Sequence, residues 1–373
     1  LQQVAKRLTQ CVREGDTVAR LGGDEFVVVL TGLGQAKAHA AAGAETVAEK
    51  IHDALNRTFS LDGVVHHSTA SIGITLFGAQ HAPAEELMMQ ADMAMYKSKN
   101  GGRNTWNFFD PRMESAMKQQ ATLQSDLRKA VDRQEFQLHY QVQVAGDGRV
   151  GGVEALVRWQ HPLRGTVSPA EFIPAAEESG IIVPLGNWVM NTACAQLAAW
   201  ASRTETAQLS MAVNVSAHQF RQSDFVDRVM QALDSSGADP RRLKIELTES
   251  LLVHNVEDII AKMRALKAVG VGFSLDDFGT GYSSLSYLKR MPLDQLKIDR
   301  SFVRDILTDA NDAAIAGTVV ALARSMGLAV IAEGVETAAQ RDALARLGCH
   351  AYQGYLYGRP LPIDQLEALL QQT

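Results

Sequence analysis

Cysteine is scarce in this sequence, and long apolar runs are missing from it. The three cysteines, Cys11, Cys194 and Cys349, are far apart and form no C-x-x-C pair, so we expect neither a disulfide framework nor a thiolate metal site. No apolar stretch reaches the roughly 18 residues that a membrane-spanning helix needs, and the first residues show no signal-peptide pattern. We therefore expect a soluble, cytoplasmic protein with reduced, structural cysteines.

Clusters of basic residues are missing as well. The sequence has no run of five or more Lys and Arg, and its formal net charge is −6. Because a polynucleotide backbone needs a basic surface, DNA and RNA are not expected partners. If the ligand is nevertheless an anionic phosphodiester, cations must offset the carboxylates around it, so a metal is expected. The 373 residues, 46% hydrophobic and 21% charged, suffice for about two globular domains.

Residues 1–110 have the pattern of an α/β sandwich. Leu1, Val4, Ala5 and Leu8 share one helical face that starts without a Met or a cap, so we expect the chain to begin inside a domain. Two β-rich runs, 17–21 and 26–30, flank Gly22-Gly23-Asp24-Glu25 and predict a hairpin. Further helices are expected over 36–57 and 84–100, with a buried strand over 69–75. Asp110-Pro111 breaks the pattern, and we place a linker and the start of a helix at 111–120.

Residues 121–373 have a different rhythm. From Phe136 onward short apolar strands alternate with amphipathic helices, such as those expected near 256–269 and 312–326. A long series of βα units is typical of a closed parallel barrel. The sequence therefore predicts a (β/α)8, TIM-like barrel preceded by a partial α/β sandwich.

Polar side chains recur where the strands of this barrel are predicted to end. They are Glu154, Asn214, Glu246, Asp276, Asp277, Lys297 and Glu333. In a parallel barrel these ends meet at one rim, where active sites are built. Clustered carboxylates repel each other unless divalent cations neutralise them, and an all-oxygen ligand set favours Mg²⁺ or Mn²⁺ over Zn²⁺. Two such cations can hold a phosphodiester and activate a water molecule.

Taken singly, these residues have ordinary structural explanations. A lone Glu at a strand end, such as Glu154, is more often a surface residue in a salt bridge. Asn214 could cap the next helix, and Lys297 could be an exposed turn residue. Arg158 could reach a phosphate with two parallel hydrogen bonds or simply lie on the surface. The joint pattern, rather than any one residue, favours a site.

The segments around these residues resemble, in order, the motifs of the EAL phosphodiesterase family. Glu154-Ala155-Leu156 matches the motif that names the family. The match continues through 157–162, 168–174, 214–216, 246–250, 276–284, 297–299, 332–337 and 353–355. The resemblance implies that residues 121–373 hydrolyse cyclic di-GMP to linear pGpG with two Mg²⁺ or Mn²⁺ ions per active site.

The resemblance also implies roles for single residues. Those matching Glu154, Asn214, Glu246 and Asp276 bind one metal ion in the family, and those matching Asp276, Asp277 and Glu333 serve the second. Lys297 matches the lysine that holds the attacking water, and Glu249 matches a residue that steadies the Asp-Asp-Phe-Gly loop. The catalytic candidates are therefore Lys297, Glu333, Asp277 and Glu249, and the substrate-binding candidates are Arg158, Leu156 and Gln353. One departure is Val142, where the family commonly has Pro; we expect it to alter how that strand ends.

Residues 1–110 resemble the later half of a GGDEF domain, the diguanylate cyclase module that makes cyclic di-GMP from GTP. The signature is Gly22, Gly23, Asp24, Glu25 and Phe26, and Arg13 with Asp16 matches the product-inhibition motif. GTP and cyclic di-GMP are therefore candidate ligands of this segment. The first strand of the family domain, which carries another metal-binding Asp, has no counterpart in it. We therefore expect no cyclase activity from this chain.

Two other functions compete with hydrolysis. A receptor could hold cyclic di-GMP without cleaving it, although such relatives usually lose metal carboxylates or the Asp-Asp-Phe-Gly-Thr-Gly loop, and this chain retains both. A barrel aldolase or enolase-like enzyme could use the same carboxylates, but it would leave the ordered motifs unexplained. By analogy with the family, residues 277–284 with Tyr287 and Leu288 suggest a homodimer formed through the barrel domain.

Overall fold

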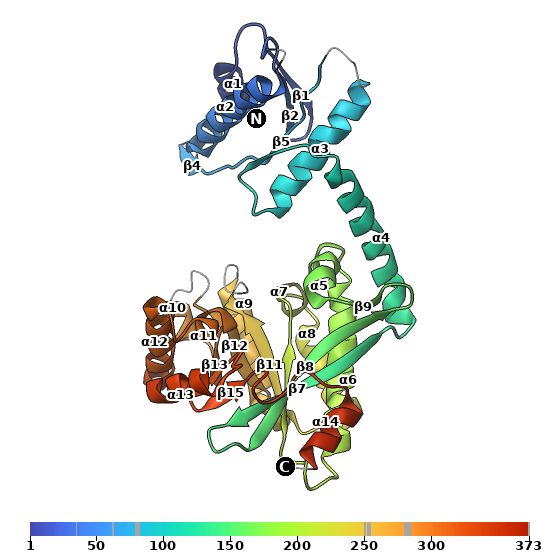
Figure 1. Ribbon diagram of the computed structural model, residues 1–373, viewed down its shortest axis with the longest axis vertical. Helices are drawn as coiled ribbons and strands as arrows, with labels where there is room; N and C mark the ends of the chain where they lie inside the picture. The colour runs from blue at the N-terminus through green and yellow to red at the C-terminus, as the bar shows by residue number, and fades with distance from the viewer. Residues whose placement is uncertain are drawn as a thin grey trace. The chain divides into compact units, whose positions relative to one another are not determined.

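The chain folds into two compact units, Leu1–Thr122 and Leu123–Thr373, here called the N-terminal and C-terminal units (Figure 1). The structure is a computed structural model, and it describes residues 1–34, 36–61, 63–78, 83–249, 251, 255–279 and 285–371. None of the helices in these ranges is both long enough and apolar enough to cross a membrane.

Within the described residues, the N-terminal unit has short strand pairs and three complete helices. Its elements are α1 Gln2–Cys11, β1 Thr17–Gly22, β2 Glu25–Val29, α2 Lys37–Asn56, β3 Phe59–Leu61, β4 Val64–His66, β5 Ile72–Ile74, α3 Ala84–Asn100 and β6 Trp106–Phe108. β1 pairs with β2 and β3 with β4 in antiparallel hairpins, while β5 and β6 are parallel. Leu8, Ile51, Leu55 and Phe59 form a small buried core. The mixed α/β content predicted for this segment is confirmed.

The C-terminal unit is a closed barrel of eight strands. They are β7 Phe136–Ala145, β8 Val150–His161, β10 Ser210–Asn214, β11 Leu243–Thr248, β12 Gly272–Phe278, β13 Gln295–Ile298, β14 Ala329–Ala332 and β15 Ala351–Gln353. Strands β8 and β10 to β15 pair in parallel in chain order, and β7 closes the barrel between β15 and β8. The predicted TIM-like barrel is thus confirmed.

One strand of this barrel runs in the opposite direction. β7 is antiparallel to both β15 and β8. The reason is local, because residues 146–149 join β7 to β8 as a tight turn in which Gly148 has φ +87°. A connection of this length can join only antiparallel strands, since a parallel pair needs a long crossover. The barrel therefore begins with a hairpin rather than with a βα unit.

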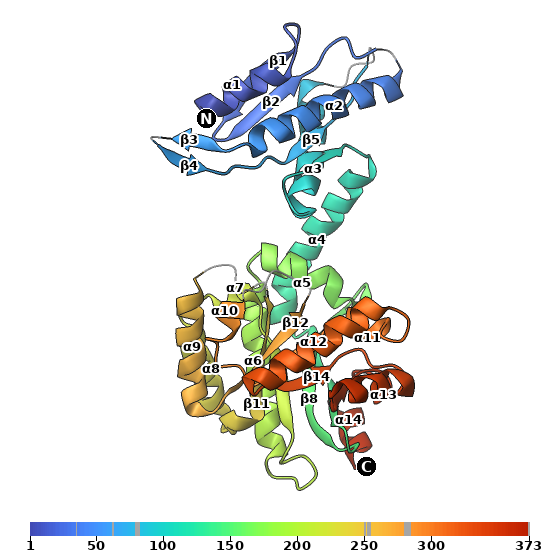
Figure 2. The same cartoon turned by 90° about the vertical axis from the view of Figure 1, so that its left-hand side faces the viewer.

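Helices surround the barrel strands (Figure 2). They are α5 Pro169–Glu178, α6 Ile182–Trp200, α7 Ala217–Phe220, α8 Phe225–Ser236, η1 Pro240–Arg242, α9 Val256–Val269, α10 Leu285–Leu288, α11 Arg300–Arg304, α12 Ala310–Met326, α13 Ala338–Leu347 and α14 Ile363–Leu370. The helix α4, Arg112–Asp132, contains the boundary between the two units, and β9, Gly165–Val167, extends the sheet beyond β8.

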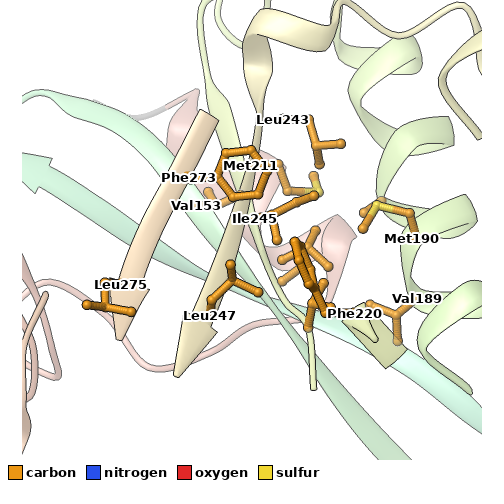
Figure 3. Packing of buried hydrophobic residues seen from close by; sticks show 14 of the residues in the cluster. Val153, Val189, Met190, Met211, Phe220, Leu243, Ile245, Leu247, Phe273 and Leu275 are labelled. Carbon is orange, nitrogen blue, oxygen red and sulfur yellow. The ribbon is translucent and has the colours of Figure 1, made fainter. Parts of the chain in front are cut away.

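The main core lies between the strands and the helices. Leu243, Ile245 and Leu247 of β11 are buried on this side, and Figure 3 shows them with Val189 and Met190 of α6. Side chains alternate across a strand, so the residues between them face the barrel interior. Burying these apolar side chains outside the barrel therefore places the polar residues of the same strands inside it.

Candidate active site

The barrel interior brings six of the predicted rim residues together. Asn214 ends β10 and lies opposite Glu246 of β11. Two residues further along β11, Thr248 lies opposite Asp276 of β12. The other three are Glu154 of β8, Lys297 of β13 and Glu333, which directly follows β14. The seventh candidate is Asp277, whose backbone belongs to β12 and whose side chain is outside the described part of the structure.

Glu154 is not at the end of its strand, which corrects the sequence prediction. β8 continues to His161, but only residues 152–155 of it pair with β10 inside the barrel. Beyond Ala155 the strand stays paired with β7 as far as Trp159, and β9 pairs with it over 159–161. The barrel part of β8 therefore ends next to Glu154, although the strand itself does not. An apolar pattern cannot reveal this, because it does not record which strand is the neighbour.

Lys297 is the centre of the cluster. Its side chain is fully buried, with 0% exposure, so the alternative of an exposed turn residue is wrong. The ammonium Nζ lies 2.6 Å from Glu246 Oε2, 3.5 Å from Asp276 Oδ2 and 3.8 Å from Glu154 Oε2. It also forms an ion pair with Glu333. One buried positive charge thus faces four carboxylates.

The charges in this cluster are unbalanced, and the pKa values reflect it. Burial raises the pKa of Glu246 well above its usual value; the Lys297 ammonium acts in the opposite direction, and the carboxylates of Glu154, Asp276 and Glu333 raise this pKa further. Burial likewise raises the pKa of Glu333 to about 8. Burial also acts to raise the pKa of Glu154, but the Lys297 ammonium and the amide of Gln353 hold it below its usual value. Glu154 is therefore an ionised carboxylate, and the cluster as a whole has room for more positive charge.

A divalent cation fits this set of donors. All the donors are carboxylate or amide oxygens, which Mg²⁺ and Mn²⁺ prefer. Among the described residues, Glu246 Oε1 is buried without a hydrogen-bond partner. In the same part of the chain no three Asp, Glu, His or Cys side chains are arranged to hold an ion, because the carboxylates converge on Lys297. A divalent cation therefore fits this site through the chemistry of the donor atoms and through the strands that bring them together.

Asn214 and Glu249 support neighbouring groups. Asn214 Nδ2 donates to Glu154 Oε1 at 2.5 Å, and Ser216 rather than Asn214 caps the following helix α7. Glu249 is buried, and its Oε2 accepts from the backbone N–H of Gly279 at 3.4 Å. Glu249 thus holds the residue that follows β12. Residues 280–284, which belong to the same predicted loop and dimer segment, are outside the described residues.

Two of the three substrate-binding candidates lie on β8, and the third ends β15. Arg158 and Leu156 are half-buried, and Gln353 at the end of β15 is buried. Burial lowers the pKa of Arg158, whose Nη1 donates to the Val157 carbonyl at 2.8 Å. Arg158 and Leu156 follow Glu154 at two-residue intervals, so all three lie on the same face of the strand.

A row of polar residues on β7 was not predicted as part of the site. His139 lies opposite Leu156, Gln141 opposite Glu154, and Gln143 opposite Gly152. Among the described residues, His139 Nε2 is buried without a hydrogen-bond partner, and burial lowers the pKa of this histidine, so it is neutral. The signal was present, because polar and apolar residues alternate strictly over 136–144. Val142 lies within this alternation, and β7 continues past it to Ala145.

The GGDEF signature residues form the hairpin of the N-terminal unit. Gly22 pairs with Glu25, so Gly23 and Asp24 form a two-residue turn, in which Gly23 has φ +49°. Phe26 follows in β2 and packs against the small core.

The inhibition-motif residues precede this hairpin. Asp16 accepts hydrogen bonds from the backbone N–H of Thr31 at 2.9 Å and of Arg13 at 3.0 Å, which lower its pKa. Its carboxylate therefore ties the two ends of the hairpin together. Arg13 itself is exposed.

Comparison with known families identifies both units. Residues 124–360 match the family model of the EAL domain, and residues 1–105 match that of the diguanylate cyclase, GGDEF domain. The chain belongs to the EAL domain family. The predicted order, a GGDEF segment followed by an EAL domain, is confirmed.

Several similar proteins carry names that refer to cyclic di-GMP. The bifunctional diguanylate cyclase/cyclic di-GMP phosphodiesterase MucR of Pseudomonas aeruginosa is 44% identical over 369 residues, covering 99% of this chain and 53% of that protein. The cyclic di-GMP phosphodiesterase PdeR of Escherichia coli is 36% identical over 367 residues, covering 98% and 54%. The solved PaMucR phosphodiesterase in its c-di-GMP complex has a TM-score of 0.64 and 47% identity, covering 66% of this chain and 99% of that one. The chain spans about half the length of these curated relatives.

Proposed function

We propose that the C-terminal unit is a phosphodiesterase that hydrolyses cyclic di-GMP to linear pGpG. The observation that carries the proposal is the buried Lys297 ammonium surrounded by the carboxylates of Glu154, Glu246, Asp276 and Glu333 inside an EAL barrel. The names of similar proteins, which include cyclic di-GMP phosphodiesterases, support the choice of substrate.

Two divalent cations are part of the proposal. Glu154, Asn214, Glu246 and Asp276 would hold one of them, and Asp276, Asp277 and Glu333 the other. When bound, such ions lower the pKa of a water molecule and neutralise phosphate oxygens. The carboxylates that now converge on Lys297 supply the negative charge that attracts these ions.

Lys297 positions the water that attacks the phosphorus. Its ammonium is fixed by ion pairs on several sides, so its N–H groups stay at one place in the site. The attack breaks one of the two phosphodiester links of the ring and leaves a terminal phosphate, so the product is a linear dinucleotide. Glu249 accepts a hydrogen bond from the backbone N–H of Gly279. It thereby fixes the end of β12, the strand that carries Asp276.

The direct test is to incubate the whole chain with cyclic di-GMP and Mn²⁺ and to separate the products by liquid chromatography. We expect pGpG to form, and we expect chelation of the metal to stop its formation. Adding GTP in a parallel reaction reveals whether the N-terminal unit affects the rate. A protein that binds cyclic di-GMP in Mn²⁺ without forming pGpG would be a receptor, and the proposal would be wrong.

We also propose that two copies associate through the C-terminal unit near Tyr287. This side chain is 39% exposed, whereas the neighbouring Leu288 is buried. An exposed aromatic residue is suited to a contact between subunits. Light scattering should give a dimer mass that Tyr287→Ser shifts toward the monomer. A monomeric wild-type protein with full activity would contradict this proposal.

A further inference from the structure

Three buried glutamines form a chain of hydrogen bonds beside Glu154. Gln141 and Gln143 lie on β7 and Gln353 ends β15, with exposures of 7%, 7% and 4%. Gln143 Nε2 donates to Gln353 Oε1 at 3.0 Å, and Gln353 Nε2 donates to Gln141 Oε1 at 3.1 Å and to Glu154 Oε2. Gln141 Nε2 donates to the Gly358 carbonyl at 3.0 Å. These hydrogen bonds therefore link two strands of the barrel, β7 and β15, to a carboxylate on a third strand, β8.

The direction of every hydrogen bond in this chain follows from its ends. The Gly358 carbonyl can only accept, so the nitrogen of Gln141 must face it and the oxygen of Gln141 must face Gln353. Glu154 Oε2 accepts from the nitrogen of Gln353, just as Oε1 accepts from the nitrogen of Asn214. Gln353 Oε1 is then left facing Gln143, which must donate.

This arrangement uses both N–H groups and the carbonyl oxygen of the Gln353 side-chain amide. Both N–H groups donate to protein oxygens, and the carbonyl oxygen accepts from Gln143. If the Gln353 amide turned by 180°, its oxygen would face the oxygen of Glu154 and the two would repel. The hydrogen bond from Gln143 opposes this rotation, because only the present orientation satisfies it. Gln353 therefore holds Glu154 in place, and the substrate contact that the resemblance implies for Gln353 stays a prediction.

We propose that Gln143 is a positioning residue that acts through Gln353 to orient the Glu154 carboxylate for a divalent cation. The role rests on the proposed phosphodiesterase site, in which Glu154 would bind a divalent cation. Asn214 holds the other oxygen of Glu154 at 2.5 Å, so the carboxylate is fixed from two sides. Groups that orient a metal ligand commonly change metal affinity or activity by about 10- to 100-fold when they are removed.

The test is a double-mutant cycle with Gln143→Met and Gln353→Met, which keep the side-chain volume and remove the amides. Mn²⁺ affinity of the whole chain is measured by calorimetry without cyclic di-GMP. We expect Gln143→Met to weaken Mn²⁺ binding by about 10- to 100-fold. Because Gln143 acts through Gln353, the double variant should bind Mn²⁺ no more weakly than Gln353→Met alone.

Gln340→Met is the matched control. Gln340 is equally buried, with 7% exposure, and its amide donates to the carbonyls of Val303 and Arg304 at 3.2 Å rather than to a candidate ligand. The Gln340→Met variant should bind Mn²⁺ as the wild type does. Circular dichroism checks the fold of each variant. Gln143→Asn, which keeps the amide but is one methylene too short, should show the same loss and replaces a poorly folded Met variant.

The outcomes separate this inference from the proposed function. Wild-type affinity in the Gln143 variants, losses that add in the double variant, or a wild type that binds no Mn²⁺ would overturn the positioning role. Weakened Mn²⁺ binding in Gln143→Met, together with a wild type that forms no pGpG, would instead leave the positioning role standing and refute the phosphodiesterase. In the active enzyme, we expect Gln143→Met to lower kcat and to leave the KM for cyclic di-GMP nearly unchanged.

Discussion

Lys297→Met is expected to abolish hydrolysis and to lower the free energy of unfolding of the metal-free protein by about 3–5 kcal/mol. The substitution removes the cation from four buried or half-buried carboxylates and leaves them to repel one another. Saturating Mn²⁺ should restore part of this loss, because an ion bound only to the folded state stabilises it. Unfolding in urea, with and without Mn²⁺, measures both effects.

Tryptophan fluorescence can follow this unfolding. Trp159, Trp188 and Trp200 lie in the C-terminal unit, and Trp106 is the remaining tryptophan of the chain. The signal is therefore dominated by the barrel rather than by the N-terminal unit, which matters because a chain of two units need not unfold in one step.

Lys262→Met is the matched control for this variant. Lys262 is also largely buried, with 10% exposure, and its Nζ lies 3.0 Å from Asp258 Oδ2 and donates to the carbonyls of Phe220, Arg221 and Gln222. These groups are on the outer helices and the segment after α7, away from the cluster. The control should lose stability, keep its activity and gain from Mn²⁺ only the stabilisation that the wild type gains. If Mn²⁺ stabilises neither the wild type nor Lys297→Met, the carboxylates around Lys297 do not bind the ion.

Glu154→Gln is expected to lower the rate of pGpG formation by more than about 100-fold, beyond the loss seen for a group that only orients a metal ligand. Both carboxylate oxygens accept hydrogen bonds, Oε1 from Asn214 and Oε2 from Gln353. A glutamine would place its own N–H₂ against one of these donors and would remove the negative charge. The measurement is kcat at saturating Mn²⁺, with circular dichroism to verify the fold.

Glu135→Gln provides the comparison for this second prediction. Glu135 Oε2 also accepts a hydrogen bond, from the indole N–H of Trp159 at 3.0 Å, but it does not contact the candidate ligands through any described hydrogen bond. Its replacement should leave kcat unchanged. A Glu154→Gln enzyme with a rate close to wild type would rule out Glu154 as a metal ligand.

Much of the fold could be predicted because helix and strand periodicity is local. The helices α3 and α9 begin and end where the pattern placed them, and the hairpin around Gly22 and Gly23 follows from residue types that favour a tight turn. The reversed strand β7 could not be predicted in the same way. The apolar pattern of a strand is the same in both directions, and direction depends on the length of the connection and on the partner strand.

The candidate site could be predicted as a list of residues but not as a set of contacts. The ordered motifs single out Glu154, Glu246 and Glu333 because each is an acidic residue beside an apolar strand. Gln141 and Gln143 were missed, although they alternate with apolar residues on β7. Their importance depends on the register of β7 against β15, which places Gln353 opposite Gln143.

Along each strand, the sequence specifies which side chains share a face, since alternation is a property of the extended backbone. It thus establishes that Glu246 lies on the opposite face from Ile245, and that polar residues recur from strand to strand. Closure of the barrel adds the contacts between residues that are far apart in the sequence. It brings Lys297 within reach of carboxylates from four other segments of the chain, because distant residues become neighbours only when β8 pairs with both β7 and β10.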